Sequence, residues 1–499
     1  MVSRRDILKL GALGLAGAAV PGLLSRPALA RALPEPFYQP LAIPPLRTGR
    51  LQGGVRTFDL TVRRGRHRFL QGVDTATLGI DADYLGPALR VRRGERVRFA
   101  VRNALSTVTT LHWHGVHLPA RMDGGPHQVI EPGAVWRPEF EIRQPASLQW
   151  YHAHPLHHTG EQVYQGLAGL FYIDDGETPP GVPTEYGVDD IPLVLQDRRF
   201  DSDGQFLYLG MMRDRMFGVH GDVMLVNGVP WPTLAVPRRR MRLRLLNGSN
   251  ARTYNLVFSD GREMLQVGTD GGLLARPVAR RSIRLAPAER ADVIVTFKPG
   301  DRVTLRHEPL PRRRRGRRGM GMMGMMSMMQ PADEPFAIMQ FTAERPEPPQ
   351  AALPQRLAEV PGWSPRRAAR TRRFVLDMAM GPRMMRGDGF TINGRSMDMA
   401  RIDARVPLGD VEIWEIVNDS PMGHPFHIHD IQFRILDRDG RPPAPWERGL
   451  KDTVWVEAGE TVRVITRFDD YADPDHPYMF HCHILEHEDG GMMGQFVVV

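Results

Sequence analysis

The amino-acid sequence predicts an all-β protein built from three consecutive β-sandwich domains. Of its 499 residues, 50 are glycine and 43 are proline, which is typical of a chain with many turns. Valine is abundant, and apolar residues alternate with polar ones in many short runs, as expected for half-buried strands. The third observation is a unit that occurs three times along the chain.

The repeated unit consists of an alternating strand, an asparagine at a turn and a second strand. Its copies occupy residues 96–115, 240–258 and 410–430. An Asn-Gly pair, which favours a tight turn, precedes the second and third copies at 226–230 and 392–396. The copies predict domains at 45–175, 185–343 and 371–499, joined by Pro-rich linkers at 177–192 and 345–365.

Histidines recur at matching positions of the first and third copies. Nine and eleven residues after the turn asparagine, the first copy has His112 and His114, and the third has His427 and His429. The same offsets in the middle copy reach apolar residues, Leu256 and Phe258. The middle domain therefore keeps the strands of the unit and lacks its imidazoles.

The ends of the first and third domains also align. "WYHAHPLHH" at 150–158 corresponds to "MFHCHILEH" at 479–487, so His152 and His154 match His481 and His483. In this alignment Ala153 of the first domain takes the position of Cys482.

Four His-x-His pairs result, and their spacing suits metal binding. Residues i and i+2 of a strand point to the same face, so each pair is expected to present two imidazoles side by side. A single pair is usually a solvated strand face. Eight histidines at matching positions of two domains instead predict a cluster of about three metal ions.

The only cysteine of the chain lies among the histidines of the last motif. One thiol forms no intramolecular disulfide, so Cys482 is either a buried bystander or a functional ligand. His424, His487 and Met492 supply the remaining donors of a site with two imidazoles, one thiolate and a weak axial thioether. That donor set is the one expected for blue copper.

Taken together, "HWHG", "WYHAH", "HPFHIH" and "HCHILEHEDGGMM" resemble, in order and spacing, the four copper signatures of the multicopper oxidases. The resemblance covers nearly the whole chain and is greatest to three-domain bacterial laccases and cuprous oxidases. It implies three cupredoxin-like Greek-key domains and four coppers per chain. It also implies one-electron oxidation of a substrate at type 1 copper and four-electron reduction of O2 to water at a trinuclear cluster.

The resemblance further implies which residue holds which copper. Type 1 copper is expected on His424, Cys482, His487 and axial Met492, and type 2 copper on His112 and His427. One type 3 copper is expected on His114, His152 and His483, and the other on His154, His429 and His481.

Acidic groups are expected near the cluster, because reduction of O2 to water consumes protons. Asp123, nine residues after His114, matches the family's acid near type 2 copper. Glu488, directly after His487, matches the family's proton-relay glutamate. With Cys482 as the electron-transfer ligand, these two carboxylates complete the predicted catalytic residues.

Residues 1–30 read as a signal peptide. Twin arginines at Arg4 and Arg5 precede an apolar run that ends at a small-residue cleavage site, Ala28-Leu29-Ala30. The apolar run is shorter than a membrane span, which needs about 20 residues. We therefore expect export by the twin-arginine machinery, a periplasmic location, no membrane anchor after cleavage, and a monomer.

The net charge of +8 comes almost entirely from arginine, and it does not indicate a nucleic-acid partner. Six arginines lie in one tract, residues 312–318, and no base-stacking motif accompanies them. Seven methionines follow within the same Met/Arg-rich loop, 311–330. Thioethers are soft ligands for Cu(I), so the loop either collects that ion or is a low-complexity insertion without a role.

The substrate stays open at this stage among phenols, aromatic amines and Cu(I), with a possible role in copper tolerance. A copper nitrite reductase is excluded, since such enzymes lack the eight-histidine set. The alternative is an exported copper-binding or scaffold protein without turnover.

Deletion of residues 320–329 tests the role of the methionines. If they collect Cu(I), the deletion lowers the rate of Cu(I) oxidation and admits bulky phenols more readily. O2 consumption with each reductant measures both effects, and an unchanged Cu(I) rate would contradict the hypothesis.

Overall fold

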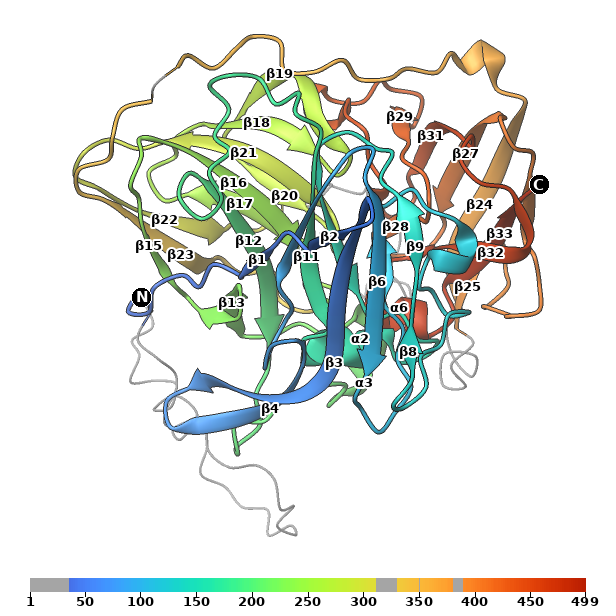
Figure 1. Cartoon of the computed structure of the whole chain (residues 1–499), viewed down its shortest axis with the longest axis horizontal. Helices are drawn as coiled ribbons and strands as arrows, with labels where there is room; N and C mark the ends of the chain where they lie inside the picture. Colours follow the sequence, from blue (N-terminus) through green and yellow to red (C-terminus); the bar gives the residue numbers. More distant parts are fainter. Residues whose placement is uncertain (1–35, 311–329, 350, 380–388) are drawn as a thin grey trace, which may run out of the picture.

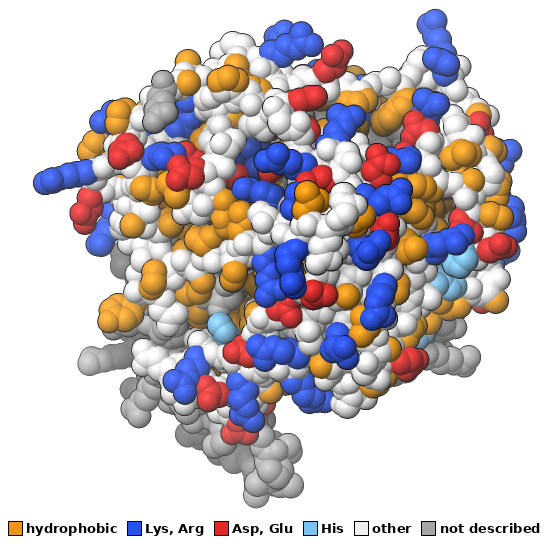
Figure 2. All heavy atoms as spheres, viewed as in Figure 1, with side chains coloured by type: hydrophobic (Ala, Val, Ile, Leu, Met, Phe, Trp, Pro, Cys, Tyr) orange, Lys and Arg blue, Asp and Glu red, His pale blue; other side chains and the backbone are white. Residues whose placement is uncertain are grey.

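The computed structural model describes residues 36–310, 330–349, 351–379 and 389–499, and it confirms the all-β prediction (Figure 1). The predicted signal peptide and residues 311–329 of the Met/Arg-rich loop lie outside these ranges. In the described part of the chain, no helix is both long and apolar enough to cross a membrane. On the face shown in Figure 2, Lys and Arg side chains are interspersed with acidic and apolar ones.

The strands of the described residues form three consecutive pairs of sheets. The first pair joins β1 (Leu46–Arg47), β5 (Ala88–Arg92), β11 (Ala168–Asp174), β10 (Ser147–His152) and β7 (His112–His114) in one sheet. Its second sheet has β2 (Arg50–Gln52), β3 (Val55–Leu70), β6 (Arg96–Asn103) and β8 (Val135–Trp136), with β4 (Val73–Ile80) on β3 and β9 (Glu139–Glu141) on β6.

The middle pair has a larger first sheet. Its order is β14 (Val229–Pro230), β13 (Val223–Val226), β12 (Asp190–Arg198), β16 (Arg240–Asn247), β21 (Arg290–Thr296), β18 (Met264–Thr269) and β19 (Gly272–Arg280). The other sheet is β15 (Thr233–Ala235), β23 (Phe336–Ala343), β22 (Asp301–His307), β17 (Tyr254–Phe258) and β20 (Ile283–Leu285).

The third pair contains the remaining strands. One sheet is β25 (Phe390–Ile392), β24 (Arg370–Met378), β27 (Val411–Asn418), β31 (Thr461–Arg467) and β29 (Arg434–Arg438). The other is β26 (Ala404–Val406), β33 (Met493–Val498), β32 (Asp473–Cys482), β28 (His424–Ile428) and β30 (Thr453–Val456). Short helices α2 (Thr159–Gln165), α3 (Met212–Phe217) and α6 (Leu485–Asp489) lie between the domains, as do 3₁₀ turns such as η2 (Ala120–Met122).

Each pair of sheets encloses its own apolar core. In the middle domain, Leu256 and Phe258 are buried in that core, at the offsets where the outer domains have histidines. Burial of one such side chain stabilises the fold by roughly 1.5–3 kcal/mol. The middle domain thus uses these positions for packing.

The turn asparagines explain why the unit repeats. Asn103, Asn247 and Asn418 each end the first strand of a copy and are fully buried. Each side-chain amide donates to two backbone carbonyls, at 2.8–2.9 Å. Each side-chain oxygen accepts the N–H two residues on, at 2.9–3.0 Å. One asparagine therefore satisfies a buried turn and fixes where the next strand starts.

The first and third domains are held together by buried polar contacts. Asp489 at the end of α6 accepts the backbone N–H groups of Thr159 and Gly160, at 2.9 and 2.8 Å, in the first turn of α2. The hydroxyl of Tyr478 on β32 donates to the carbonyl of Leu118, at 2.7 Å. These contacts bring β7 and β10 of the first domain against β28 and β32 of the third.

Gly124 tests how tightly the loop after η2 is packed. Its φ is +76°, and a Cβ there would collide with the carbonyl oxygen of Leu111. We expect Gly124→Ala to lower the free energy of unfolding by about 3 kcal/mol, from left-handed strain plus overpacking. Gly133, with φ +80° and nothing within 4 Å of its Cβ position, is the matched control and should cost about 1 kcal/mol. Denaturant unfolding measures both, and equal losses would contradict the packing argument.

Candidate metal centre

The eight histidines of the His-x-His pairs meet between the first and third domains. All are buried, with at most 1% of each side chain exposed. His154 and His429 each direct Nε2 at Nε2 of His481, at 3.2 and 3.1 Å. His114 Nδ1 lies 3.4 Å from Nε2 of His152. The imidazole nitrogens therefore converge across the domain boundary.

The strand placement expected for the pairs is correct for one pair only. His112 and His114 both lie in β7. In the other pairs the first histidine lies in a strand and the second follows its end: His154 after β10, His429 after β28 and His483 after β32. The chain leaves each sheet at these points, yet ring centroids within a pair stay 5.0–5.8 Å apart.

The outward-facing nitrogens of several rings are held by the protein. His112 Nδ1 donates to the carbonyl of Asp123, at 2.9 Å, and His427 Nδ1 donates to the carbonyl of Asp452, at 2.8 Å. His114 contacts the Asp452 carboxylate through Nε2, at 3.1 Å. These partners assign the tautomers, and they leave His112 Nε2, His427 Nε2 and His114 Nδ1 facing the centre.

Several rings of this cluster are in the form that binds metal. Burial is the main cause that lowers the pKa of His114, His427 and His429 well below the ordinary value, with neighbouring imidazoles adding to it. The pKa of His481 falls to about 3 for the same first cause. Neutral imidazoles keep a lone pair for a metal ion.

Copper fits these residues. His112 Nε2, His427 Nε2 and both ring nitrogens of His483 are buried and have no hydrogen-bond partner among the described residues. Buried polar atoms normally have partners, because an unpaired one costs roughly 1–3 kcal/mol. A metal ion would satisfy these nitrogens, and imidazole suits copper.

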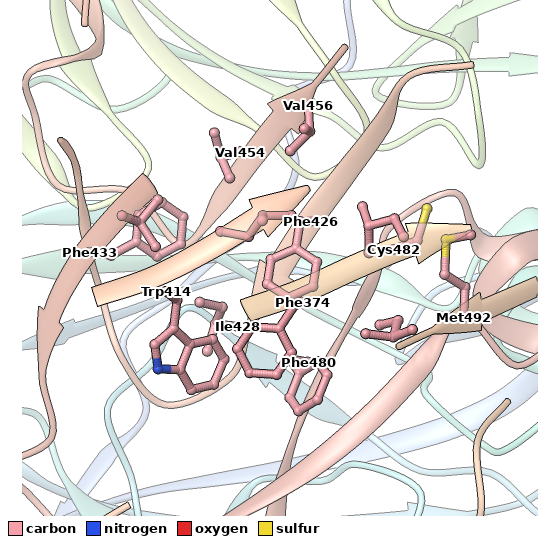
Figure 3. Packing of buried hydrophobic residues seen from close by; sticks show 14 of the residues in the cluster. Phe374, Trp414, Phe426, Ile428, Phe433, Val454, Val456, Phe480, Cys482 and Met492 are labelled. Atoms are coloured by element: carbon pink, nitrogen blue, oxygen red, sulfur yellow. The ribbon is translucent and has the colours of Figure 1, made fainter. Parts of the chain in front are cut away.

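The second cluster contains the predicted type 1 donors. Nδ1 of His424 and of His487 lie 3.3 and 3.8 Å from the Cys482 sulfur, and 3.2 Å from each other. Met492 is fully buried in the same apolar cluster as Cys482, and Figure 3 shows both sulfur-bearing side chains at one end of it. Burial raises the pKa of the Cys482 thiol, so the thiolate needs a cation to form.

Both imidazoles of this second cluster, His424 and His487, are hydrogen-bonded on the side away from the sulfur. His424 donates through Nε2 to the hydroxyl of Ser420, at 2.7 Å. His487 donates through Nε2 to the backbone carbonyl of Met216 in α3, at 3.1 Å, and stacks on Phe390 with 4.2 Å between ring centroids. Both rings are fully buried, with Nδ1 turned toward the sulfur.

The two predicted acids touch the histidine cluster. Asp123 Oδ2 accepts from His429 Nδ1, at 2.7 Å. The carboxylate oxygens of Glu488 lie 3.3 and 3.2 Å from Nδ1 of His154 and of His481. Burial and then the nearby Asp489 raise the pKa of Glu488 well above its ordinary value. A buried carboxyl that stays protonated beside the cluster can hold a proton there.

Asp452, Ser420 and Met216 belong to the site and were not predicted from the sequence. Met216 lies in the middle domain and acts through its backbone, so no sequence signal marks it. Asp452 lies in "KDTV", 25 residues after His427, and only the pairing of β28 with β30 brings the two together. Ser420, four residues before His424, has the only local signal of the three.

Comparison with known proteins decides the family. Three protein-family models, each described as multicopper oxidase, match residues 61–178, 199–304 and 370–499 of the sequence. A multicopper oxidase, mco of Staphylococcus haemolyticus, is 34% identical over 451 residues, which is 89% of each chain. The chain belongs to the multicopper oxidase family. Its three domains are accordingly cupredoxin-like, and the family implies copper.

Two further similarities of this multicopper oxidase point in different directions. A laccase-like multicopper oxidase, CueO of Ochrobactrum sp., has a solved structure that superposes with a TM-score of 0.81 at 37% identity, covering 92% of this chain and all of the other. That protein has oxidase activity towards lignin model compounds and lignosulfonate. The cell division protein FtsP of Escherichia coli is 34% identical over 502 residues, covering 100% of this chain and 99% of FtsP.

Replacement of Asp123 tests its place in the reaction. Asp123→Asn keeps the size of the side chain and removes the carboxylate that His429 contacts, so we expect slower reoxidation by O2. Electron uptake at the Cys482 site should keep its rate, which provides an internal control. Stopped-flow absorption follows both steps, and equal slowing of the two would contradict this role.

Proposed function

We propose that this multicopper oxidase couples one-electron oxidation of a phenol, an aromatic amine or Cu(I) to four-electron reduction of O2 to water. The observation that carries the proposal is the complete set of buried imidazoles, among which His112 Nε2, His427 Nε2 and both ring nitrogens of His483 have no hydrogen-bond partner in the described residues. A protein that bound no metal would gain nothing from keeping these costly unpaired groups.

The proposed ligand sets follow the two clusters. Type 1 copper would be held by His424, Cys482, His487 and Met492. Type 2 copper would be held by His112 and His427, and the type 3 pair by His114, His152 and His483 and by His154, His429 and His481. When bound, the four coppers supply one-electron redox chemistry and a place for O2 to bind.

The chain supplies connection and shielding. Cys482 stands between His481 and His483, so the two clusters are joined through one side chain and its adjacent peptides. This path is on the order of 10 Å, given a reach of at most about 3.6 Å per residue. Because every donor is buried, water is excluded from the Cys482 sulfur and from the imidazoles.

Proton supply is the second task of the chain. Reduction of one O2 to two waters takes up four electrons and four protons. Glu488 lies against one histidine of the first domain and one of the third, and burial favours its protonated form. Asp123 lies against His112 and His429. We propose that these two carboxyl groups deliver protons to the cluster.

The hydrogen bonds that His424 and His487 make to the protein restrict where a reductant can deliver its electron. Neither His424 nor His487 offers a free N–H to a substrate, since Ser420 and Met216 occupy both. Electrons would therefore enter through the wall that includes α3. Met211 and Met212 stand at its exposed end, with 41% and 70% of each residue exposed. Such thioethers favour a soft reductant such as Cu(I), and copper tolerance would follow from its oxidation.

The alternative is an exported copper-binding or scaffold protein without turnover. Similarity to FtsP over the full chain is the observation that favours it. The complete ligand set favours oxidation instead. In either case we propose export to the periplasm by the twin-arginine machinery, cleavage of the signal, and a monomeric mature chain.

O2 consumption by the copper-loaded protein decides between these functions. We expect uptake with Cu(I), and weaker uptake with a simple phenol that rises when Cu(II) is added. Cys482→Ser, which removes the thiolate and keeps the fold, is the control and should abolish uptake. Strong phenol turnover indifferent to added copper would indicate a general laccase, and absence of uptake with both reductants would support the scaffold alternative.

A further inference from the structure

Arg290 is a residue of the copper-free middle domain that reaches the boundary of all three domains. It begins β21 and is about 1% exposed, with its side chain fully buried. Its guanidinium donates through Nε to the carbonyl of Leu148, at 3.1 Å, and through Nη2 to the side chain of Gln149, both in the first domain. Nη1 and Nη2 also donate to Asp452 of the third domain, and to the backbone carbonyls of Ala288 and Asp270 within the middle domain.

The contact with Asp452 is bidentate. Arg290 donates through Nη1 to Oδ1, at 2.7 Å, and through Nη2 to Oδ2, at 2.5 Å. This parallel geometry fixes the plane of the carboxylate as well as its position. Breaking a buried ion pair is strongly destabilising, because it leaves an uncompensated charge in the protein interior. Arg290 therefore contributes two of the hydrogen bonds that hold the Asp452 carboxylate in this orientation.

Asp452 in turn orients two imidazoles from different domains. Its Oδ1 contacts Nε2 of His114, at 3.1 Å, and its backbone carbonyl accepts Nδ1–H of His427, at 2.8 Å. The hydroxyl of Thr453 also donates to Oδ1, at 2.9 Å. The two rings stack with 3.7 Å between centroids and 11° between planes. The Thr453 hydroxyl also lies 3.4 Å from His114 Nε2 and 3.3 Å from His427 Nδ1, so Asp452 and its neighbour together set which nitrogen of each ring faces the metal centre.

We propose that Arg290 is a positioning residue through which the middle domain fixes the imidazoles of His114 and His427 for copper. It acts through Asp452 and touches neither copper nor substrate. The inference rests on the proposed function only in requiring that the histidine cluster binds copper. It gives the middle domain, which has no histidine at the repeat positions, a defined part in the copper site.

A second buried arginine of the same domain provides a matched control. Arg244 on β16 makes an equally buried bidentate pair with Asp190 on β12, with Nε to Oδ1 at 2.7 Å and Nη2 to Oδ2 at 2.8 Å. Among the described residues, neither Arg244 nor Asp190 contacts a histidine of the cluster. Replacing Arg244 therefore removes a similar buried charge from a pair that does not contact the histidine cluster.

The experiment compares Arg290→Met with Arg244→Met in the full chain. Copper per chain after dialysis against graded chelator, the type 2 EPR signal, the near-ultraviolet absorption of the type 3 pair, and Tm are measured without substrate. We expect Arg290→Met to bind cluster copper about 10- to 100-fold more weakly and to show an altered type 2 signal. Arg244→Met should lower Tm and keep wild-type copper content and spectra.

Two further variants, Asp452→Asn alone and Asp452→Asn combined with Arg290→Met, test whether Arg290 acts through Asp452. If Arg290 acts through Asp452, Arg290→Met adds no further loss of copper in the Asp452→Asn background. Should Arg290→Met fail to fold, Arg290→Lys replaces it, since one ammonium retains charge and loses the bidentate contact.

The inference is overturned if the Arg290 variants keep wild-type copper affinity and type 2 signal, or if Arg244→Met loses copper equally. It is also overturned if the losses in the double variant simply add. A wild-type protein that binds copper with these spectra and consumes no O2 would defeat the proposed function alone.

Discussion

The structure depends on one constraint: imidazoles must stay neutral and unpaired on one side while buried away from water. Burial keeps them neutral, as the lowered pKa values of the cluster show. A protein partner on the outward nitrogen then keeps a ring from rotating. The backbone carbonyls of Asp123 and Asp452 fill this role for His112 and His427. The open inner nitrogens are the destabilising cost that a bound metal offsets.

The three domains divide this task unequally. The first and third each contribute four imidazoles to the cluster between them, and the third alone has the thiol, where the first has buried Ala153. The middle domain replaces imidazoles by Leu256 and Phe258 in its core. It nevertheless reaches both metal centres from outside, through the carbonyl of Met216 at His487 and through Arg290 at Asp452. The domain that lacks the repeated histidines thereby contacts both clusters of donor residues.

Much of the fold and of the donor set could be predicted from the sequence, because both follow local rules. The asparagine offsets and the alternating strands are short-range patterns, and the buried asparagines show why they repeat. The His-x-His spacing also marked side chains that the structure brings together, although three pairs extend past their strands. Ser420, Asp452 and Arg290 were not found, because their roles arise from contacts between strands or domains. A backbone carbonyl such as that of Met216 has no side-chain signature to read.

The central claim is that the chain stores four electrons and delivers them together to O2. Anaerobic titration of the copper-loaded protein with a reductant, followed by addition of measured O2, tests it most directly. The account predicts uptake of four reducing equivalents per chain, bleaching of the thiolate-to-copper absorption, and full reoxidation by one O2 without release of hydrogen peroxide. Uptake of a single equivalent, or peroxide as the product, would contradict it.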